Sequence, residues 1–197
     1  MPRALSASDR RTSCLRLVLP ISRIGLTALL ILISCTSVFS QARKPTEYEV
    51  KAAYLYNFGK FIRWPSSASS DSHFSICIFG TDPFGNSLDG ITSGESLDGK
   101  RLAVRRINSA SEVQGCRILF ISRSEQGRAS SVLGAVKHLP ILTVSDMPDF
   151  VDNGGIIGFV MQGDRVRFQV SLPAAERAGL SLSSELLRVA ASVKRES

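Results

Sequence analysis

The sequence has few of the residues that build a metal site or a catalytic centre. Its two histidines, His73 and His138, stand at the start of a predicted strand and the end of a predicted helix, where an exposed side chain needs no special role. No nucleophile elbow (G-x-S-x-G), phosphate-binding P-loop or dinucleotide-binding G-x-G-x-x-G motif stands where each would be required. We therefore predict no catalytic residue, no cofactor and no metal, and a protein that is not an enzyme.

The sequence also lacks a long hydrophobic run. Its apolar stretch Ile24–Ile33 has about ten residues, roughly half of what a transmembrane helix needs. Arginines precede this stretch and small residues follow it at Ser40–Ala42, a pattern typical of a cleaved secretory signal peptide. We predict that residues 1–42 are this signal peptide and that residues 43–197 form the mature domain. The alternative is lipid anchoring through Cys35, because the residues before it resemble a bacterial lipobox.

Little net charge remains once the leader is removed. The whole chain carries +7, but from Gln41 onward nineteen Lys and Arg residues stand against sixteen Asp and Glu residues, which leaves +3. The remaining basic cluster, Arg101, Arg105 and Arg106, has no interleaved aromatic residues. On a strand, Arg105 and Arg106 point to opposite faces. We predict no nucleic-acid partner.

Apolar strands alternate with helical segments through the mature chain. Phe74–Gly80 and Cys116–Ser122 are almost continuously apolar, as expected of strands buried on both faces. The remaining predicted elements are strands at Leu102–Ile107 and Ile141–Ser145, and helices that begin at Asp82-Pro83 or span Ser124–Lys137, Pro173–Ala178 and Ser183–Lys194.

The strand predicted at Arg165–Val170 differs from the others because apolar and polar residues alternate along it, so one of its faces should meet solvent or a partner. It pairs with Ile156–Met161 across a turn at Gly163-Asp164. Together these elements predict a single-domain α/β fold. Its mixed, mostly parallel sheet is flanked by helices and has an antiparallel hairpin at one edge.

The aromatic residues are concentrated in one segment. Six of the fourteen lie between Thr46 and Pro65. Thr46 and Glu49 form the pattern of a capping box, and Pro65 disfavours helical geometry in the residue before it, so a helix is predicted between these points.

Apolar side chains of this predicted helix share one broad face. We expect three of them in the core: Val50, Tyr54 and Phe61. Three basic residues are expected to stay near water: Lys51, Lys60 and Arg63. Phe58 and Trp64 are left as candidate partner-binding residues, whose exposure would indicate such a role.

Polar residues follow three of the apolar strands. Parallel sheets bind ligands beyond the carboxyl ends of their strands, so Asp82, Ser122 and Asp146 are candidate ligand-binding residues in a crevice there. The alternative is that they are ordinary helix-capping and turn residues.

Two cysteines, Cys77 and Cys116, remain in the mature chain, and both lie in apolar strands. In an oxidising compartment such a pair tends to be bridged, provided that the two strands are neighbours. The residues leave two alternatives, a disulfide or two buried free thiols.

Several motifs in order resemble the YfiR family of bacterial periplasmic proteins. They are VKAAYLYNFGKFIRWP, FGTDPFG, CRILFIS, ILTVSDMPDF with GGIIGFV, and RVRFQVSLPAAERAGLSLSS, which together cover essentially the whole mature chain. The resemblance implies a periplasmic repressor that binds the periplasmic sensor region of an inner-membrane diguanylate cyclase. It thereby controls cyclic-di-GMP signalling and biofilm formation.

The resemblance also implies roles for particular residues. Cys77 and Cys116 match a family cysteine pair that can form a disulfide, whereas a second pair found in some members is absent near Val151 and Gly158. The strand from Arg165 matches a region implicated in repression, which makes three of its residues candidate partner-binding residues: Arg165, Arg167 and Gln169.

Two functions of different classes remain. The first is a protein-binding regulator, with the redox state of the cysteine pair affecting its stability or its fit. The second is a periplasmic small-molecule-binding protein that uses the crevice at the strand ends. The sequence leaves the oligomeric state open, a homodimer included.

Overall fold

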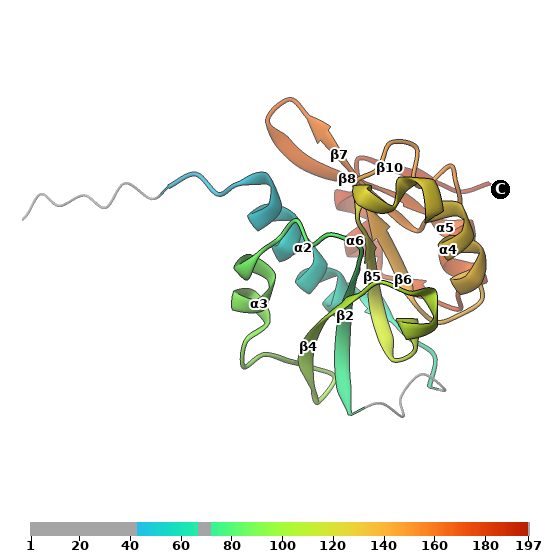
Figure 1. Ribbon diagram of the computed structural model, residues 1–197. Helices are drawn as coiled ribbons and strands as arrows, with labels where there is room; N and C mark the ends of the chain where they lie inside the picture. The colour runs from blue at the N-terminus through green and yellow to red at the C-terminus, as the bar shows by residue number, and fades with distance from the viewer. Residues whose placement is uncertain (1–42, 67–71, 197) are drawn as a thin grey trace, which may run out of the picture. The chain divides into compact units, whose positions relative to one another are not determined.

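The structure is a computed structural model that describes residues 43–66 and 72–196. The predicted signal peptide and Cys35 lie outside the described residues. Within these residues, eight strands form one sheet in the order β10-β8-β7-β6-β5-β2-β4-β3 (Figure 1). They are β2 (His73–Phe79), β3 (Ser96–Leu97), β4 (Lys100–Ile107), β5 (Cys116–Ile121), β6 (Leu142–Ser145), β7 (Ile157–Gln162), β8 (Arg165–Ser171) and β10 (Ser192–Lys194).

Most neighbouring strands run parallel. Strands β4, β2, β5, β6 and β7 form a continuous parallel set, while β8 is antiparallel to β7 and β3 is antiparallel to β4. The predicted mixed, mostly parallel sheet is therefore confirmed. The β7–β8 hairpin is not the outermost part of the sheet, because β10 pairs in parallel with β8 on its outer side.

Helices cover both faces of the sheet. The described helices are α2 (Glu47–Phe61), α3 (Asn86–Thr92), α4 (Ala129–Val136), α5 (Leu172–Arg177) and α6 (Ser184–Val189), with 3-10 turns at Ala110–Val113 and Arg123–Arg128. A short ladder, β1 (Ile62–Arg63) with antiparallel β9 (Ser181–Leu182), joins the end of α2 to the segment before α6.

Alternate residues of β5 enter two separate cores, as the continuous apolar run predicts. Ile118 and Phe120 pack in the core under α2, whereas Leu119 and Ile121 pack in the core under α4. All four side chains are fully buried. Burial on both faces is the condition under which a parallel sheet is stable, because its helical connections cover each side.

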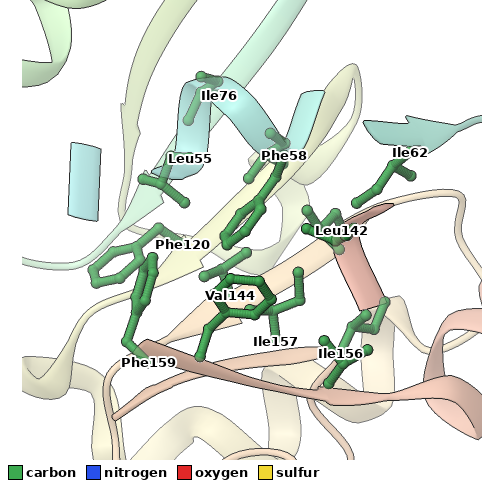
Figure 2. Close-up of a cluster of buried hydrophobic side chains, with 14 of the residues drawn as sticks. Leu55, Phe58, Ile62, Ile76, Phe120, Leu142, Val144, Ile156, Ile157 and Phe159 are labelled. Atoms are coloured by element: carbon green, nitrogen blue, oxygen red, sulfur yellow. The ribbon is translucent and has the colours of Figure 1, made fainter. Parts of the chain in front are cut away.

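The helix predicted from the capping box is present. Thr46 Oγ1 accepts a hydrogen bond from the backbone N–H of Glu49, and the Glu49 carboxylate accepts one from the N–H of Thr46. Figure 2 shows how Phe58 of this helix points into the core, close to Phe159 of β7 and Val144 of β6. The Phe58 ring centroid lies 5.9 Å from that of Phe159 and 5.1 Å from that of Phe168.

The C-terminal prediction is partly wrong. A single helix was expected over Ser183–Lys194, but α6 ends at Val189 and β10 follows. The chain leaves the helix because Ala190 is extended and the N–H of Ala191 donates to the carbonyl of Phe168 at 2.7 Å. The backbone N–H of Ala191 thus bonds to the edge of β8 instead of continuing the helix.

Two other helices begin later than predicted. Asp82 does not cap α3; its carboxylate accepts from the N–H of Phe84, and the helix starts after Gly85, whose φ is +55°. The segment after Ser122 forms a 3-10 turn before α4, and Ser122 caps that turn.

Cys77 and Cys116 form a disulfide between the neighbouring strands β2 and β5. Their Cα atoms are 5.8 Å apart, and both residues lie in the core under α4. The bridge confirms the pairing that the resemblance implied and excludes the alternative of two free thiols in this structure.

Replacing both cysteines by alanine should lower the free energy of unfolding by about 3 to 4 kcal/mol, because the bridge closes a loop between residues 39 positions apart. Denaturant unfolding of the mature protein measures the loss. As a control, reductant should lower the midpoint of the natural protein and leave that of the double variant unchanged. An unchanged midpoint for the natural protein in reductant would contradict the prediction.

Candidate functional site

The β7–β8 hairpin has the half-exposed character that the sequence predicted. Val166, Phe168 and Val170 are buried toward α2. On the opposite face, Arg165 is exposed, and Arg167 and Gln169 are half-buried. The turn residue Gly163 has a φ of +60°, which the tight connection requires.

The distal half of this hairpin extends past the strand beside it. Strand β6 pairs with β7 through Val144–Ile157 and Ser145–Gly158 alone, so the part from Phe159 to the turn runs beyond β6 (Figure 1). Asp164 in the turn pairs with Lys44, just before α2, with Nζ and Oδ2 2.6 Å apart. The hairpin tip thus presents backbone and polar side chains to the surroundings.

Two predictions for the aromatic helix are wrong. Phe58 was a candidate contact residue, but it is 1% exposed and lies in the core. Phe61 was expected in the core, but it is 39% exposed. The reason is the direction of the buried stripe, which runs through Ala52, Leu55 and Phe58 and leaves Phe61 at its margin.

Trp64, the other aromatic candidate, is half-buried. Its ring packs edge-to-face on Phe74 with centroids 5.2 Å apart. Phe74 belongs to β2, so this contact ties the end of the aromatic segment to the sheet.

Phe61 instead borders an apolar groove between α2 and α6. The groove has a volume of about 410 Å³, and Phe168 of β8 is also part of its lining. On the α6 side it is bounded by Leu186, which is buried, and by Val189, which is 55% exposed. Apolar side chains exposed in such a groove are typical of contact surfaces.

The three predicted ligand-binding residues already have partners within the chain. The Asp82 carboxylate accepts from Arg106 Nε at 3.0 Å, and the same guanidinium binds Asp89. That pairing raises the pKa of Arg106 and lowers the pKa of Asp89. Ser122 is buried, and its side chain caps the 3-10 turn at Arg123–Arg128 by accepting from the N–H of Ser124. A ligand at these positions would have to replace such contacts.

Asp146 is the centre of a buried polar cluster that the sequence did not predict. Its Oδ2 accepts from Lys51 Nζ at 2.6 Å and from the Tyr48 hydroxyl at 2.9 Å, and Arg123 approaches Oδ1 at 3.3 Å. Lys51 also pairs with Glu47 and lies over the Tyr48 ring. Lys51 was expected near water, but it is 1% exposed.

Charge pairing outweighs burial at Asp146. Burial by itself raises the pKa of this carboxyl, but the Lys51 ammonium, the Tyr48 hydroxyl and the Arg123 guanidinium lower it, and the net pKa lies below the usual value. Burial and the hydrogen bond to Asp146 raise the pKa of Tyr48 to about 12. At neutral pH the Asp146 carboxyl is therefore ionised, whereas the Tyr48 hydroxyl keeps its proton and donates it to Asp146. These contacts tie the first turn of α2 to the end of β6.

Across residues 43–66 and 72–196, no group of three or more His, Cys, Asp or Glu side chains could hold a metal ion. In the same ranges, no helix has the length and apolar character needed to cross a membrane.

Comparison with known families covers most of the described residues. A model of the YfiR/HmsC-like family matches residues 48–191, which include α2 from its second residue, both cysteines and the β7–β8 hairpin. The chain belongs to the YfiR/HmsC-like family. The resemblance drawn from the sequence motifs is therefore confirmed. No curated protein matches the chain.

One similar solved structure is described as a conserved domain protein from Vibrio cholerae O1 biovar El Tor strain N16961. It is 11% identical with a TM-score of 0.51, and the match covers 76% of this chain and 60% of that one. The chain thus spans less than two thirds of that protein. At this identity the likeness shows the fold alone.

Of the residues in the Asp146 cluster, Lys51 alone has a local sequence signal for its ion pair. Lys51 lies four positions after Glu47 in a helix whose neighbours are apolar, a spacing that allows an ion pair. The second partner of Lys51 is Asp146, which is 95 positions later in the sequence, and no local pattern predicts that contact.

Replacing Lys51 by methionine should lower the free energy of unfolding by about 3 kcal/mol, because it leaves Asp146 buried with less compensation. The matched control is Lys60→Met in the same helix. Lys60 is exposed and its ammonium lies over the Tyr56 ring, so this change should cost no more than about 1 kcal/mol. Denaturant unfolding at neutral pH compares the two variants, and equal losses would contradict the structural role given to Lys51.

Proposed function

We propose that this protein is a non-enzymatic periplasmic regulator that binds the periplasmic sensor region of an inner-membrane diguanylate cyclase and represses it. The cyclase makes cyclic-di-GMP, so repression would limit biofilm formation. Membership of the YfiR/HmsC-like family is the observation that carries the proposal. A leader with the features of a signal peptide, residues 1–42, supports export of the mature domain, residues 43–197.

The half-exposed hairpin supports a docking role. Arg165 is exposed on one face of this hairpin, beside the half-buried Arg167 and Gln169. Their strand resembles a family region implicated in repression, which supports the same role. Arginine is enriched in protein interfaces because its guanidinium forms several directed hydrogen bonds. The groove bordered by Phe61 and Val189 lies beside the same strand and offers an apolar anchor point.

The buried disulfide supports a redox-responsive version of this role. Cys77 and Cys116 bridge two central strands, so reduction would lower the stability of the whole sheet rather than change a surface contact. A reduced protein that unfolds more readily would release the cyclase.

The alternative function, small-molecule binding at Asp82, Ser122 and Asp146, stays a prediction. The ion pairs of Asp82 with Arg106 and of Asp146 with Lys51 disfavour it, because a ligand would compete with these contacts. We therefore place protein binding first.

Reversing the charge of Arg165 tests the docking face. Arg165→Glu should weaken binding to the periplasmic domain of the nearest encoded diguanylate cyclase by about tenfold, because an interfacial charge is replaced by its opposite. The matched control is Arg101→Glu, an exposed strand arginine on β4, which should change the affinity by less than about twofold.

Titration calorimetry with the mature protein gives both affinities. Thermal unfolding should show that both variants remain folded, since neither side chain is buried. Absence of binding by the natural protein, oxidised and reduced, would remove the proposed function. Equal effects of the two reversals would remove the docking face.

A further inference from the structure

The outer edge of β8 has backbone groups without a strand to pair with. Gln162 and Arg165 flank a two-residue turn and pair with each other, so in the antiparallel ladder the N–H and C=O of Val166 point away from β7. The carbonyl of Phe168, two residues on, confirms this direction because it accepts from Ala191 on the outer side. In the part of the chain that the structure describes, no backbone hydrogen bond reaches Val166 from that side.

The remainder of this edge is covered by β10. Ser192–Lys194 pair in parallel with Gln169–Ser171, and Val193 stands opposite Val170. The side chain of Lys194 also pairs with the Asp152 carboxylate, with Nζ and Oδ1 2.8 Å apart. The Lys194 side chain is 38% exposed and that of Asp152 is 63% exposed. A three-residue strand at the chain end, held by a surface ion pair, belongs to the least stable part of a fold.

The family match gives an independent view of β10. It ends at Ala191, one residue before this strand begins. The matched segment therefore includes β8 and Ala191, whose N–H donates to Phe168, but not β10.

The side chains of β8 define what an added strand must carry. On one face it would meet the exposed Arg165 and the half-buried Arg167, whose guanidinium donates to the Val189 carbonyl at 3.2 Å. Both cations favour acidic residues directly opposite them. On the other face it would meet Val166 and Phe168, which favour apolar residues, as Val193 already does opposite Val170. A segment that alternates acidic and apolar side chains fits both faces.

We propose that the protein partner docks by adding such an extended, acidic-apolar segment to the outer edge of β8, and that β10 is a cover that this segment displaces. The inference rests on the proposed function, because it gives the mode by which the cyclase would be bound. Strand addition supplies backbone hydrogen bonds along the seven residues of β8 and uses side chains for specificity.

Amide hydrogen exchange of the mature protein, purified after export of the full chain, tests this mode with and without the cyclase periplasmic domain. The amide of Val166 should exchange quickly in the free protein and at least tenfold more slowly in the complex. The amides of Ser192–Lys194 should change in the opposite direction, since β10 leaves the edge. A complex in which neither set changes would overturn strand addition while the proposed function stands. Failure to form a complex would overturn both.

Two variants test the same edge through affinity. Val166→Pro removes an N–H that points away from β7, so it should weaken binding by about tenfold, while Val166→Ala, which keeps that N–H, should have a smaller effect. A chain ending at Ala191 should bind about tenfold more tightly, because no cover has to be displaced. If that chain does not fold, Val193→Asp weakens β10 at full length and should act in the same direction. Unchanged affinity in the folded variants would overturn the proposal.

Discussion

The packing of one aromatic side chain, Phe58, joins the two ends of this fold. Its ring contacts Phe159 and Phe168, which stand opposite each other in the β7–β8 hairpin, so the first helix of the domain supports the last long strands. A hairpin that runs past its neighbouring strand has little sheet to rest on, and α2 replaces that support on one face. Because α2 packs on one face of β8, the strand can leave its opposite face accessible.

A second constraint fixes the start of the same helix. The Lys51–Asp146 pair is buried beneath Tyr48, and it joins the first turn of α2 to the carboxyl end of β6. Buried ion pairs contribute modestly to stability but penalise alternative packings, because each charge needs its partner. Many α/β proteins bind ligands at the ends of their parallel strands, and here Asp82 and Asp146 at these ends pair with Arg106 and Lys51. For this reason the docking proposal concerns the edge of the sheet.

Sequence patterns predicted the elements whose signals are local. The capping box at Thr46, the doubly buried strand at Cys116–Ile121 and the alternation along β8 each depend on residues close in the chain, and each was found. Contacts between distant residues decided the rest. Periodicity alone could not choose between Phe58 and Phe61 as the buried ring, because both lie on the broad apolar face and the position of the hairpin selects one. Likewise, α6 stops early because β8 offers backbone partners at Ala191.

The chain is an α/β domain of the YfiR/HmsC-like family in which a disulfide joins the neighbouring strands β2 and β5. Its proposed function is repression of a membrane diguanylate cyclase through the outer side of the β7–β8 hairpin. Cyclic-di-GMP production by that cyclase tests this function in membrane vesicles whose periplasmic side faces the added protein. Oxidised, mature protein should lower the rate of production in a saturable manner. A rate that stays unchanged at saturating protein would contradict it.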